Sequence, residues 1–172
     1  NVRVANLTLT GGYSEGHGCA GGGGLLLTAN DMSNLDSDNG NNVIPSYPLI
    51  ENIIIEGNHS HNGGGLALFR IKGPELNNVI IRDNTATAYG GGIFSYVSTT
   101  TMTDVTVTGN ENFEEQGGGI MLAASQGTFD NMTITDNIGA GHGGGIWTNN
   151  SGGFGNHSEG WTMTNSIVSG NS

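Results

Sequence analysis

Short stretches of alternating apolar and polar residues recur along the chain at a nearly constant spacing. Four segments of nine residues can be superposed, and each ends in asparagine: 50–58, 76–84, 102–110 and 129–137. Each segment is followed by three glycines and an aliphatic residue. The last glycines of these triplets are 26 to 27 residues apart, at Gly65, Gly92, Gly119 and Gly145. A looser first copy and half of a sixth flank these four, so the chain is built from a repeat.

Within each copy the alternation has a period of two, which is typical of β-strands. Val105 and Val107, for example, are separated by one threonine, and β-branched residues are frequent in these segments. Alignment of the copies gives five apolar columns: Val4/Ile50/Leu76/Met102/Phe129/Met163, Leu7/Ile53/Val79/Val105/Met132, Leu9/Ile55/Ile81/Val107/Ile134/Val168, Leu25/Leu66/Ile93/Ile120/Ile146 and Leu27/Leu68/Leu122.

A single copy cannot bury its apolar face alone, but stacked copies form a continuous core. The repeat therefore predicts an all-β fold, a parallel β-helix (solenoid) of about five and a half rungs spaced ~4.8 Å apart. Two loop insertions, 28–48 and 148–160, interrupt the repeat. We expect one domain over 1–172 and, because the chain opens on Asn1, a fragment of a longer protein.

Asparagine and glycine recur at fixed places in the repeat. One asparagine column contains Asn58, Asn84, Asn110, Asn137 and Asn171. The other contains Asn6, Asn52, Asn78, Asp104, Asn131 and Asn165. Asparagine tolerates the left-handed backbone of a tight bend, and stacked amides form hydrogen-bonded ladders. We expect both properties in both columns, and we expect the glycine triplets to allow positive φ angles and close backbone approach.

Composition excludes several classes of function. The 172 residues include 4 Lys+Arg against 15 Asp+Glu, for a net charge of −11. This charge excludes a basic nucleic-acid surface and disfavours an anionic membrane surface. No apolar run is long enough to insert into a membrane, and the single cysteine, Cys19, excludes an intrachain disulfide. With 32 glycines, disorder would be the usual expectation, but disordered chains do not keep a repeat in register.

The unit Phe129-Asp-Asn-Met-Thr-Ile-Thr-Asp-Asn137, leading to Gly143-Gly-Gly-Ile146, resembles the repeats of bacterial right-handed parallel β-helix surface proteins. It is especially similar to the chlamydial polymorphic outer-membrane protein repeat, with its Gly-Gly-Ala-Ile and Phe-x-x-Asn signatures. Glycine replaces the alanine here, and the spacing from Phe129 to Asn131 is one residue shorter. The resemblance implies a right-handed parallel β-helix and an extracellular or cell-surface protein. It does not specify an activity, because such rods include adhesins, stalks and carbohydrate-active enzymes.

The sequence favours a non-catalytic structural or adhesive rod. Only Arg3, Arg70, Lys72 and Arg82 are available as bases, and Arg82 aligns with Glu56 as a surface ion pair. Asp104 and Asp130 fall close together on adjacent copies, and we assign Asp104 to a ladder and Asp130 to a solvent-facing position or a turn. We therefore predict no catalytic residues. The alternative is a polysaccharide lyase or hydrolase, or a carbohydrate-binding module, on the same fold.

The insertion offers a metal candidate. Asn34, Asp36 and Asp38 alternate like the first ligands of a calcium loop. Gly40 comes one position late for that motif, and no glutamate ends the loop, so a solvated acidic loop is the alternative. His17, Cys19, His59 and His61 are the one His/Cys grouping, and their spacing matches no zinc motif.

An apolar column on the outer side of the strand after each triplet is a candidate contact surface. It comprises Leu26, Ala67, Phe94, Met121 and Trp147. Such a patch marks a contact with glycan rings or another subunit, and Phe94, Tyr96, Met121 and Trp147 are the predicted binding residues. The alternative is that the insertions, with Ile44, Tyr47, Phe154 and Trp161, cover it.

Three further expectations concern the surface. Sequons at Asn149 and Asn156 are the best-placed glycosylation sites. The terminal copies would expose strand edges, which predicts self-association or neighbouring domains of the parent chain as partners. Outward Thr-x-Thr pairs, such as Thr106 and Thr108, leave an ice-binding face as an alternative, although Glu56 and Arg82 interrupt the array.

Overall fold

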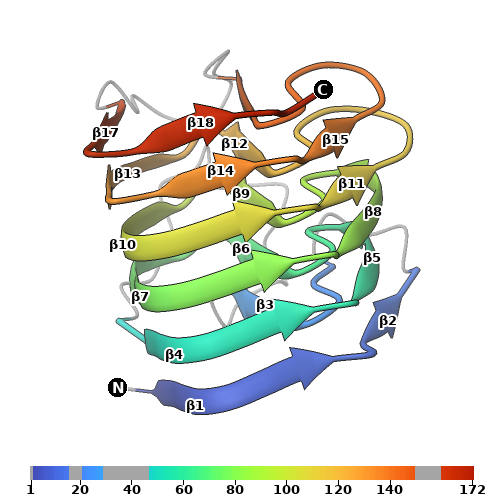
Figure 1. The fold of residues 1–172 in the computed structure, drawn as a ribbon. Coiled ribbons are helices and arrows are strands. Elements are labelled where there is room, and N and C mark those ends of the chain that lie inside the picture. The colour runs from blue at the N-terminus through green and yellow to red at the C-terminus, as the bar shows by residue number, and fades with distance from the viewer. Residues whose placement is uncertain (1, 16–20, 29–46, 150–159) are drawn as a thin grey trace, which may run out of the picture.

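The computed structural model describes residues 2–15, 21–28, 47–149 and 160–172, and this part of the chain is all β-structure. Its strands form three sheets stacked along one direction, and every paired strand runs parallel to its neighbour (Figure 1). In the described residues no helix has the length and apolarity needed to cross a bilayer. Most of the two insertions, 28–48 and 148–160, lies outside the described residues.

Each copy of the repeat adds one strand, or two short ones, to each sheet, and we call one folded copy a rung. Sheet A contains β1 (Arg3–Thr10), β4 (Leu49–Glu56), β7 (Lys72–Arg82), β10 (Thr99–Thr108), β13 (Gln126–Asp130), β14 (Thr133–Thr135), β17 (Trp161–Thr164) and β18 (Ile167–Ser169). Sheet B contains β2 (Tyr13–Ser14), β5 (His59–Asn62), β8 (Thr85–Tyr89), β11 (Glu111–Asn112) and β15 (Ile138–Gly139). Sheet C contains β3 (Leu25–Thr28), β6 (Leu66–Phe69), β9 (Ile93–Tyr96), β12 (Ile120–Ala123) and β16 (Ile146–Asn149).

The register of the sheets confirms the predicted apolar columns. Ile55, Ile81 and Val107 pair in successive strands of sheet A, and each is fully buried. In sheet C, Leu66, Ile93 and Ile120 likewise pair in successive strands and are buried. Inward side chains of both sheets form one core cluster. A side-chain period of two therefore places the aliphatic residues of every copy on the same inner face.

The exposed asparagine column bends sheet A. Asn6, Asn52, Asn78, Asp104, Asn131 and Asn165 all have φ between 51° and 58°. Nδ2 of Asn78 donates to Oδ1 of Asn52 over 2.8 Å, and Asn131 donates likewise to Asp104. The left-handed bend and the ladder predicted for this column are both confirmed.

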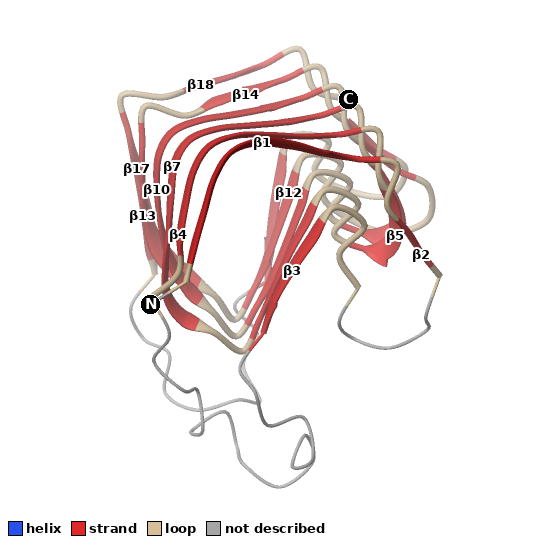
Figure 2. Cartoon of the chain, turned by 90° about the horizontal axis from the view of Figure 1, so that it is seen from below, coloured by secondary structure: helices blue, strands red, loops and turns tan. Residues whose placement is uncertain are grey.

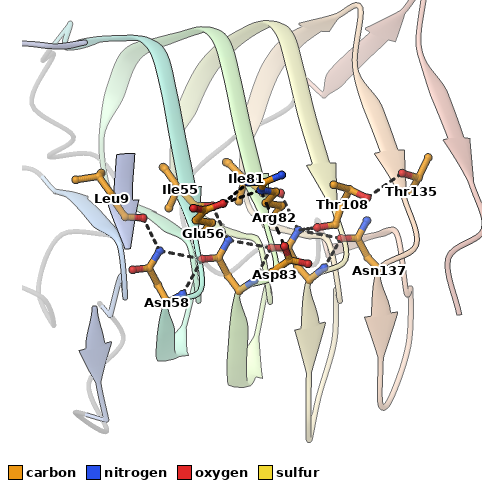
Figure 3. A network of polar contacts seen from close by, with 12 residues as sticks. Leu9, Ile55, Glu56, Asn58, Ile81, Arg82, Asp83, Thr108, Thr135 and Asn137 are labelled. Carbon is orange, nitrogen blue, oxygen red and sulfur yellow. Dashed lines mark hydrogen bonds and ion pairs between the residues drawn. The ribbon is translucent and has the colours of Figure 1, made fainter. Parts of the chain in front are cut away.

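The second asparagine column forms a buried ladder (Figure 3). Nδ2 of Asn58 donates to Oδ1 of Asn84 at 2.9 Å, and Nδ2 of Asn84 donates to Oδ1 of Asn110 at 3.0 Å. Each amide also reaches back to the rung below, as Nδ2 of Asn84 does to the carbonyl of Ile55 at 2.9 Å. The ladder is confirmed, but the left-handed backbone predicted for this column is wrong. The preceding residue takes it instead, as Asp83 (φ 54°) and Gly109 (φ 62°) do.

A third ladder uses serine at the corner between sheets C and A. Ser98 Oγ donates to the carbonyls of Tyr96 and Leu68, at 2.9 and 3.2 Å. The backbone N–H of Ser98 donates to Oγ of Ser125, which stands one rung above, at 3.3 Å. Both serines are buried. The hydroxyls satisfy backbone groups that the corner removes from the sheet, and the sequence analysis had not identified this role.

Each glycine of a triplet is required for a different reason. The first, such as Gly90, has a positive φ of 62°. The second has no room for a side chain, because a Cβ on Gly91 would lie 2.4 Å from the carbonyl oxygen of Gly118. The third lies against the ladder, since a Cβ on Gly92 would come within 3.0 Å of Nδ2 of Asn110. The triplet is therefore a closely packed corner between sheets B and C.

The predicted surface ion pair is also present. Nη2 of Arg82 lies 2.6 Å from Oε2 of Glu56, and both side chains are partly exposed. One rung lower, Arg3 pairs with Glu51. Exposed pairs of this kind contribute about 0–1 kcal/mol each, so the ladders and the core contribute more to the stacking of the rungs.

The buried ladder generates the first prediction. Asn84→Ala removes the oxygen that accepts both the backbone N–H and the Nδ2 of buried Asn58. We expect the free energy of unfolding to fall by about 2–4 kcal/mol, measured by urea denaturation. Asn77→Ala, at an exposed position of β7 in the same rung, is the control and should change stability by less than about 0.5 kcal/mol. Equal losses in the two variants would contradict a structural role for the ladder.

The triplets generate the second prediction. Gly91→Ala places a methyl group 2.4 Å and 2.5 Å from the carbonyl oxygens of Gly118 and Glu111, which are backbone atoms that cannot rotate away. We expect a loss of about 3 kcal/mol or more, visible as a lower melting temperature in circular dichroism. Gly160→Ala is the control, because nothing lies within 4 Å of its added Cβ. A Gly91→Ala protein as stable as the control would show that the corner tolerates a side chain.

Candidate functional site

A groove on the outer side of sheet C is the best-formed candidate site. Its volume is about 310 Å³, at the lower end of the range for small-molecule sites. Three columns of three residues line it, and together they span four successive rungs: Asn62, Tyr89 and Gln116; Phe94, Met121 and Trp147; Tyr96, Ala123 and Asn149.

The glycine corners bring these columns together. Tyr89 ends β8 in sheet B, and the triplet that begins at Gly90 turns the chain into β9 of sheet C. Figure 2 shows the loops that join the two sheets at this corner. Residues just before a triplet therefore lie beside the outward residues of the strand that follows it, and Tyr89 and Phe94 come within 6.1 Å between ring centroids.

The aromatic rings of the groove are almost parallel. Phe94 and Tyr96 have centroids 6.2 Å apart with planes 9° apart, and Tyr96 stacks on Phe69 of the rung below at 5.2 Å and 15°. With Ala67 and Met121, these rings form an apolar cluster separate from the main core. The rings fix one another's orientation, so the groove has a rigid aromatic wall.

The lining of the groove carries no charged side chain among the described residues, and asparagine and glutamine amides supply most of its polar groups. Burial raises the pKa of Tyr89, and the negative charge of Glu115 raises it further. Oε2 of Glu115 also accepts a hydrogen bond from Nε2 of Gln116 at 3.4 Å. The groove is therefore uncharged at neutral pH, with a carboxylate close to one side.

All four predicted binding residues, Phe94, Tyr96, Met121 and Trp147, line this groove. Sheet C also places the predicted outward column in register. The column is not the exposed patch that the alternation predicted, because Ala67, Phe94 and Met121 are only 0%, 4% and 6% exposed and pack within one apolar cluster. These buried side chains support the wall of the groove, which the partly exposed Tyr96 and Trp147 complete.

Sequence reasoning missed the remaining lining residues, namely Asn62, Tyr89, Gln116, Ala123 and Asn149. Asn62, Tyr89 and Gln116 each stand directly before a glycine triplet, and Ala123 and Asn149 each end the strand that follows one. Asn149 had been selected for its sequon, and the structure places it at the exposed end of β16 rather than in a loop. Asn156 lies outside the described residues.

The aromatic residues of the insertions were the alternative cover for this surface. Tyr47 and Trp161 lie elsewhere: the Tyr47 ring packs on Gly73, and Trp161 packs against the main core beside Phe129. Ile44 and Phe154 lie outside the described residues, so the structure does not test the alternative for them.

The acid candidates Asp104 and Asp130 do not line the groove, and the structure does not test the metal candidates. Asn34, Asp36 and Asp38, proposed for calcium, lie outside the described residues, as do His17 and Cys19. Elsewhere in the described ranges no group of three or more His, Cys, Asp or Glu side chains is arranged to hold a metal ion.

Asp104 belongs to the exposed ladder, as predicted. Asp130 accepts hydrogen bonds from Thr164 and Asn165 at 2.7 Å, which hold its pKa below the ordinary value. Both carboxylates therefore serve the stacking of sheet A.

A second hollow, of about 350 Å³, is lined by Glu15, His61, Thr87 and Glu114. Among the described residues its lining consists of these four polar side chains, without an aromatic wall. The groove on sheet C combines an apolar wall with several amides, which is the usual composition of a ligand site. We therefore take the groove as the candidate functional site.

Comparison with known proteins gives no match to this chain among family models, curated proteins or solved structures.

The third prediction concerns the electrostatics of the groove. Glu115→Gln removes the negative charge that raises the pKa of Tyr89 but leaves its burial unchanged. We therefore expect the phenol to titrate at lower pH in the variant, while remaining above the ordinary tyrosine value. The measurement is ultraviolet difference titration, with Tyr89→Phe identifying the signal. An unchanged Tyr89 titration would place the Glu115 carboxylate too far away to act on the groove.

Proposed function

We propose that this chain is a right-handed parallel β-helix that serves as a non-catalytic, extracellular structural and adhesive rod, and that the groove on sheet C binds carbohydrate. The aromatic wall of the groove, bordered by amides, is the observation that carries this proposal. Sugar rings present C–H groups on their faces and hydroxyls around their edges. The negatively polarised face of an aromatic ring attracts the C–H groups, and side-chain amides form hydrogen bonds with the hydroxyls.

The parallel in-register stacking of the sheets supports the β-helix, because parallel strands 26 to 27 residues apart require the chain to return to the same side after each rung. The similarity of the repeats to those of bacterial surface proteins supports the right-handed form and the extracellular location.

A polysaccharide-cleaving enzyme on the same fold is the alternative. Glycoside hydrolysis requires two carboxyl groups about 5–9.5 Å apart across the scissile bond. The described lining of the groove offers only the phenols of Tyr89 and Tyr96 as titratable groups, and the raised pKa of Tyr89 keeps its phenol protonated at neutral pH. These features favour retention of a glycan over its cleavage.

Association at the ends of the rod belongs to the same proposal. Leu7 and Val168 occupy inward columns in the outermost described strands of sheet A, yet they are 40% and 50% exposed. A further rung, from a neighbouring domain or a second copy, would bury both side chains and continue the strand pairing.

The fourth prediction tests carbohydrate binding on a glycan array, with and without calcium. We expect one class of glycan to be retained without cleavage products. Tyr96→Ala and Trp147→Ala should each weaken binding about tenfold, since a stacking contact contributes about 0.5–1.5 kcal/mol and 1.4 kcal/mol is a factor of ten.

Phe113→Ala is the matched control, because Phe113 is an aromatic residue 49% exposed outside the groove. Cleaved products would favour the enzyme instead, and the absence of any retained glycan would contradict carbohydrate binding. Retention only in calcium would add the insertion with Asn34, Asp36 and Asp38 to the ligand-binding part of the protein.

A further inference from the structure

The aromatic stack beside the groove ends at Tyr96. The last residues of β6, β9, β12 and β16 form a column in register: Phe69, Tyr96, Ala123 and Asn149. Phe69 and Tyr96 stack at 5.2 Å, close to the spacing of the strands themselves. The next position along the column holds a methyl group instead of a third ring, so the column lacks one ring-sized group between Tyr96 and Asn149.

The surroundings of Ala123 make this end of the stack part of the groove. Ala123 is only partly buried, and it lines the groove together with Tyr96 on one side and Asn149 on the other. Met121, on the same strand, stands above Phe94 and beneath Trp147. The space above Tyr96 is therefore bordered by a flat ring, a neighbouring indole and an amide.

A group that takes the place of the missing ring has to be flat and about one ring thick, with an apolar face toward Tyr96 and hydrogen-bonding edges. A pyranose in its chair form meets these requirements, because its axial C–H groups make one face apolar and its hydroxyls lie around the rim. C–H groups on an aromatic face gain from the ring's negative charge distribution. An aromatic side chain from a second copy could also stack on Tyr96. It has no hydroxyls around its edge, however, to form hydrogen bonds with the amides of Asn62, Gln116 and Asn149.

Charge restricts the sugar further. The described lining has no cation, Glu115 is close enough to raise the pKa of Tyr89, and the chain has a net charge of −11. Of the chain's arginines, Arg3 and Arg82 are paired with Glu51 and Glu56 on sheet A. A uronate or another acidic sugar would lose its hydration without meeting a positive partner.

We propose that Ala123 forms a subsite for a single uncharged pyranose, which stacks on Tyr96 as the missing member of the column and hydrogen-bonds the amide of Asn149. This inference rests on the proposed carbohydrate binding and adds the position, the number of rings and the charge of the sugar. Ala123 determines specificity by its small size, and Tyr96 and Asn149 contact the sugar.

The decisive variant replaces Ala123 with a ring that would occupy the space proposed for the sugar. Ala123→Phe extends the stack from Phe69 and Tyr96 by one ring, so we expect its melting temperature to equal or exceed that of the unmodified chain. Binding is measured by isothermal titration calorimetry with cellotetraose, chitotetraose and β-1,4-galactotetraose as uncharged probes and tetragalacturonate as the acidic one. We expect the unmodified chain to bind at least one uncharged probe at least tenfold more tightly than tetragalacturonate, and Ala123→Phe to lose at least tenfold in affinity for it.

Ala140→Phe is the matched control, because Ala140 is exposed and does not line the groove. It should bind as the unmodified chain does. Asn149→Ala provides a second test that adds no bulk, and we expect a loss of about three- to tenfold, as for one hydrogen bond of about 0.5–1.5 kcal/mol.

The outcomes separate this inference from the proposed function. Full binding by Ala123→Phe, or equal binding of tetragalacturonate, would overturn the subsite while leaving carbohydrate binding in place. A dimer of the unmodified chain that Ala123→Phe disperses, seen by sedimentation, would assign the space to a second copy and also overturn it. If neither the uncharged probes nor the acidic probe binds the unmodified chain, the proposed function fails first.

Discussion

Each amide of the buried ladder accepts hydrogen bonds from the rung below and donates to the rung above, so the rungs can stack only with their asparagines aligned. In the middle of the ladder, Asn84 and Asn110 have no exposed surface, and their hydrogen bonds have lengths of 2.9–3.1 Å. A slip of one residue would leave buried amides unsatisfied and turn every aliphatic column toward solvent. This one constraint fixes the register of all three sheets.

The same register also orders the surface: each outward residue lies directly above its counterpart in the previous rung. Side chains that repeat form stacks or ladders, as Phe69 and Tyr96 do. A side chain that breaks the repeat leaves a hollow of defined size, as Ala123 does above Tyr96. In such an architecture, departures from the repeat are the places to look for binding, and agreement with the repeat indicates structure.

The sequence predicted what depends on periodicity. The inward columns, the parallel strands, the Glu56–Arg82 pair and the two asparagine ladders all follow from aligning the copies. It did not predict which residue of the bend carries the positive φ, since Asp83 and Asn84 both tolerate that conformation and only the packing of the ladder decides. The sequence predicted only some of the residues that line the groove. Phe94 and Trp147 were visible as a stripe, but the inclusion of Tyr89 depends on how sharply the glycine corner turns, which no alignment of strands contains.

The same corner links the fold to the proposed activity. Gly90 supplies the positive φ, and Gly91 lies so close to the next rung that a Cβ would meet its carbonyl oxygens. Such a tight turn brings Tyr89 of sheet B against Phe94 of sheet C. The glycines therefore do more than permit stacking, because they also close one side of the groove. Since the wall is built from rings whose backbones are fixed by neighbouring rungs, the groove keeps its shape without a ligand, which reduces the entropy lost on binding. A stack of rungs with a preformed, uncharged aromatic groove is suited to holding the proposed sugar without changing its own conformation.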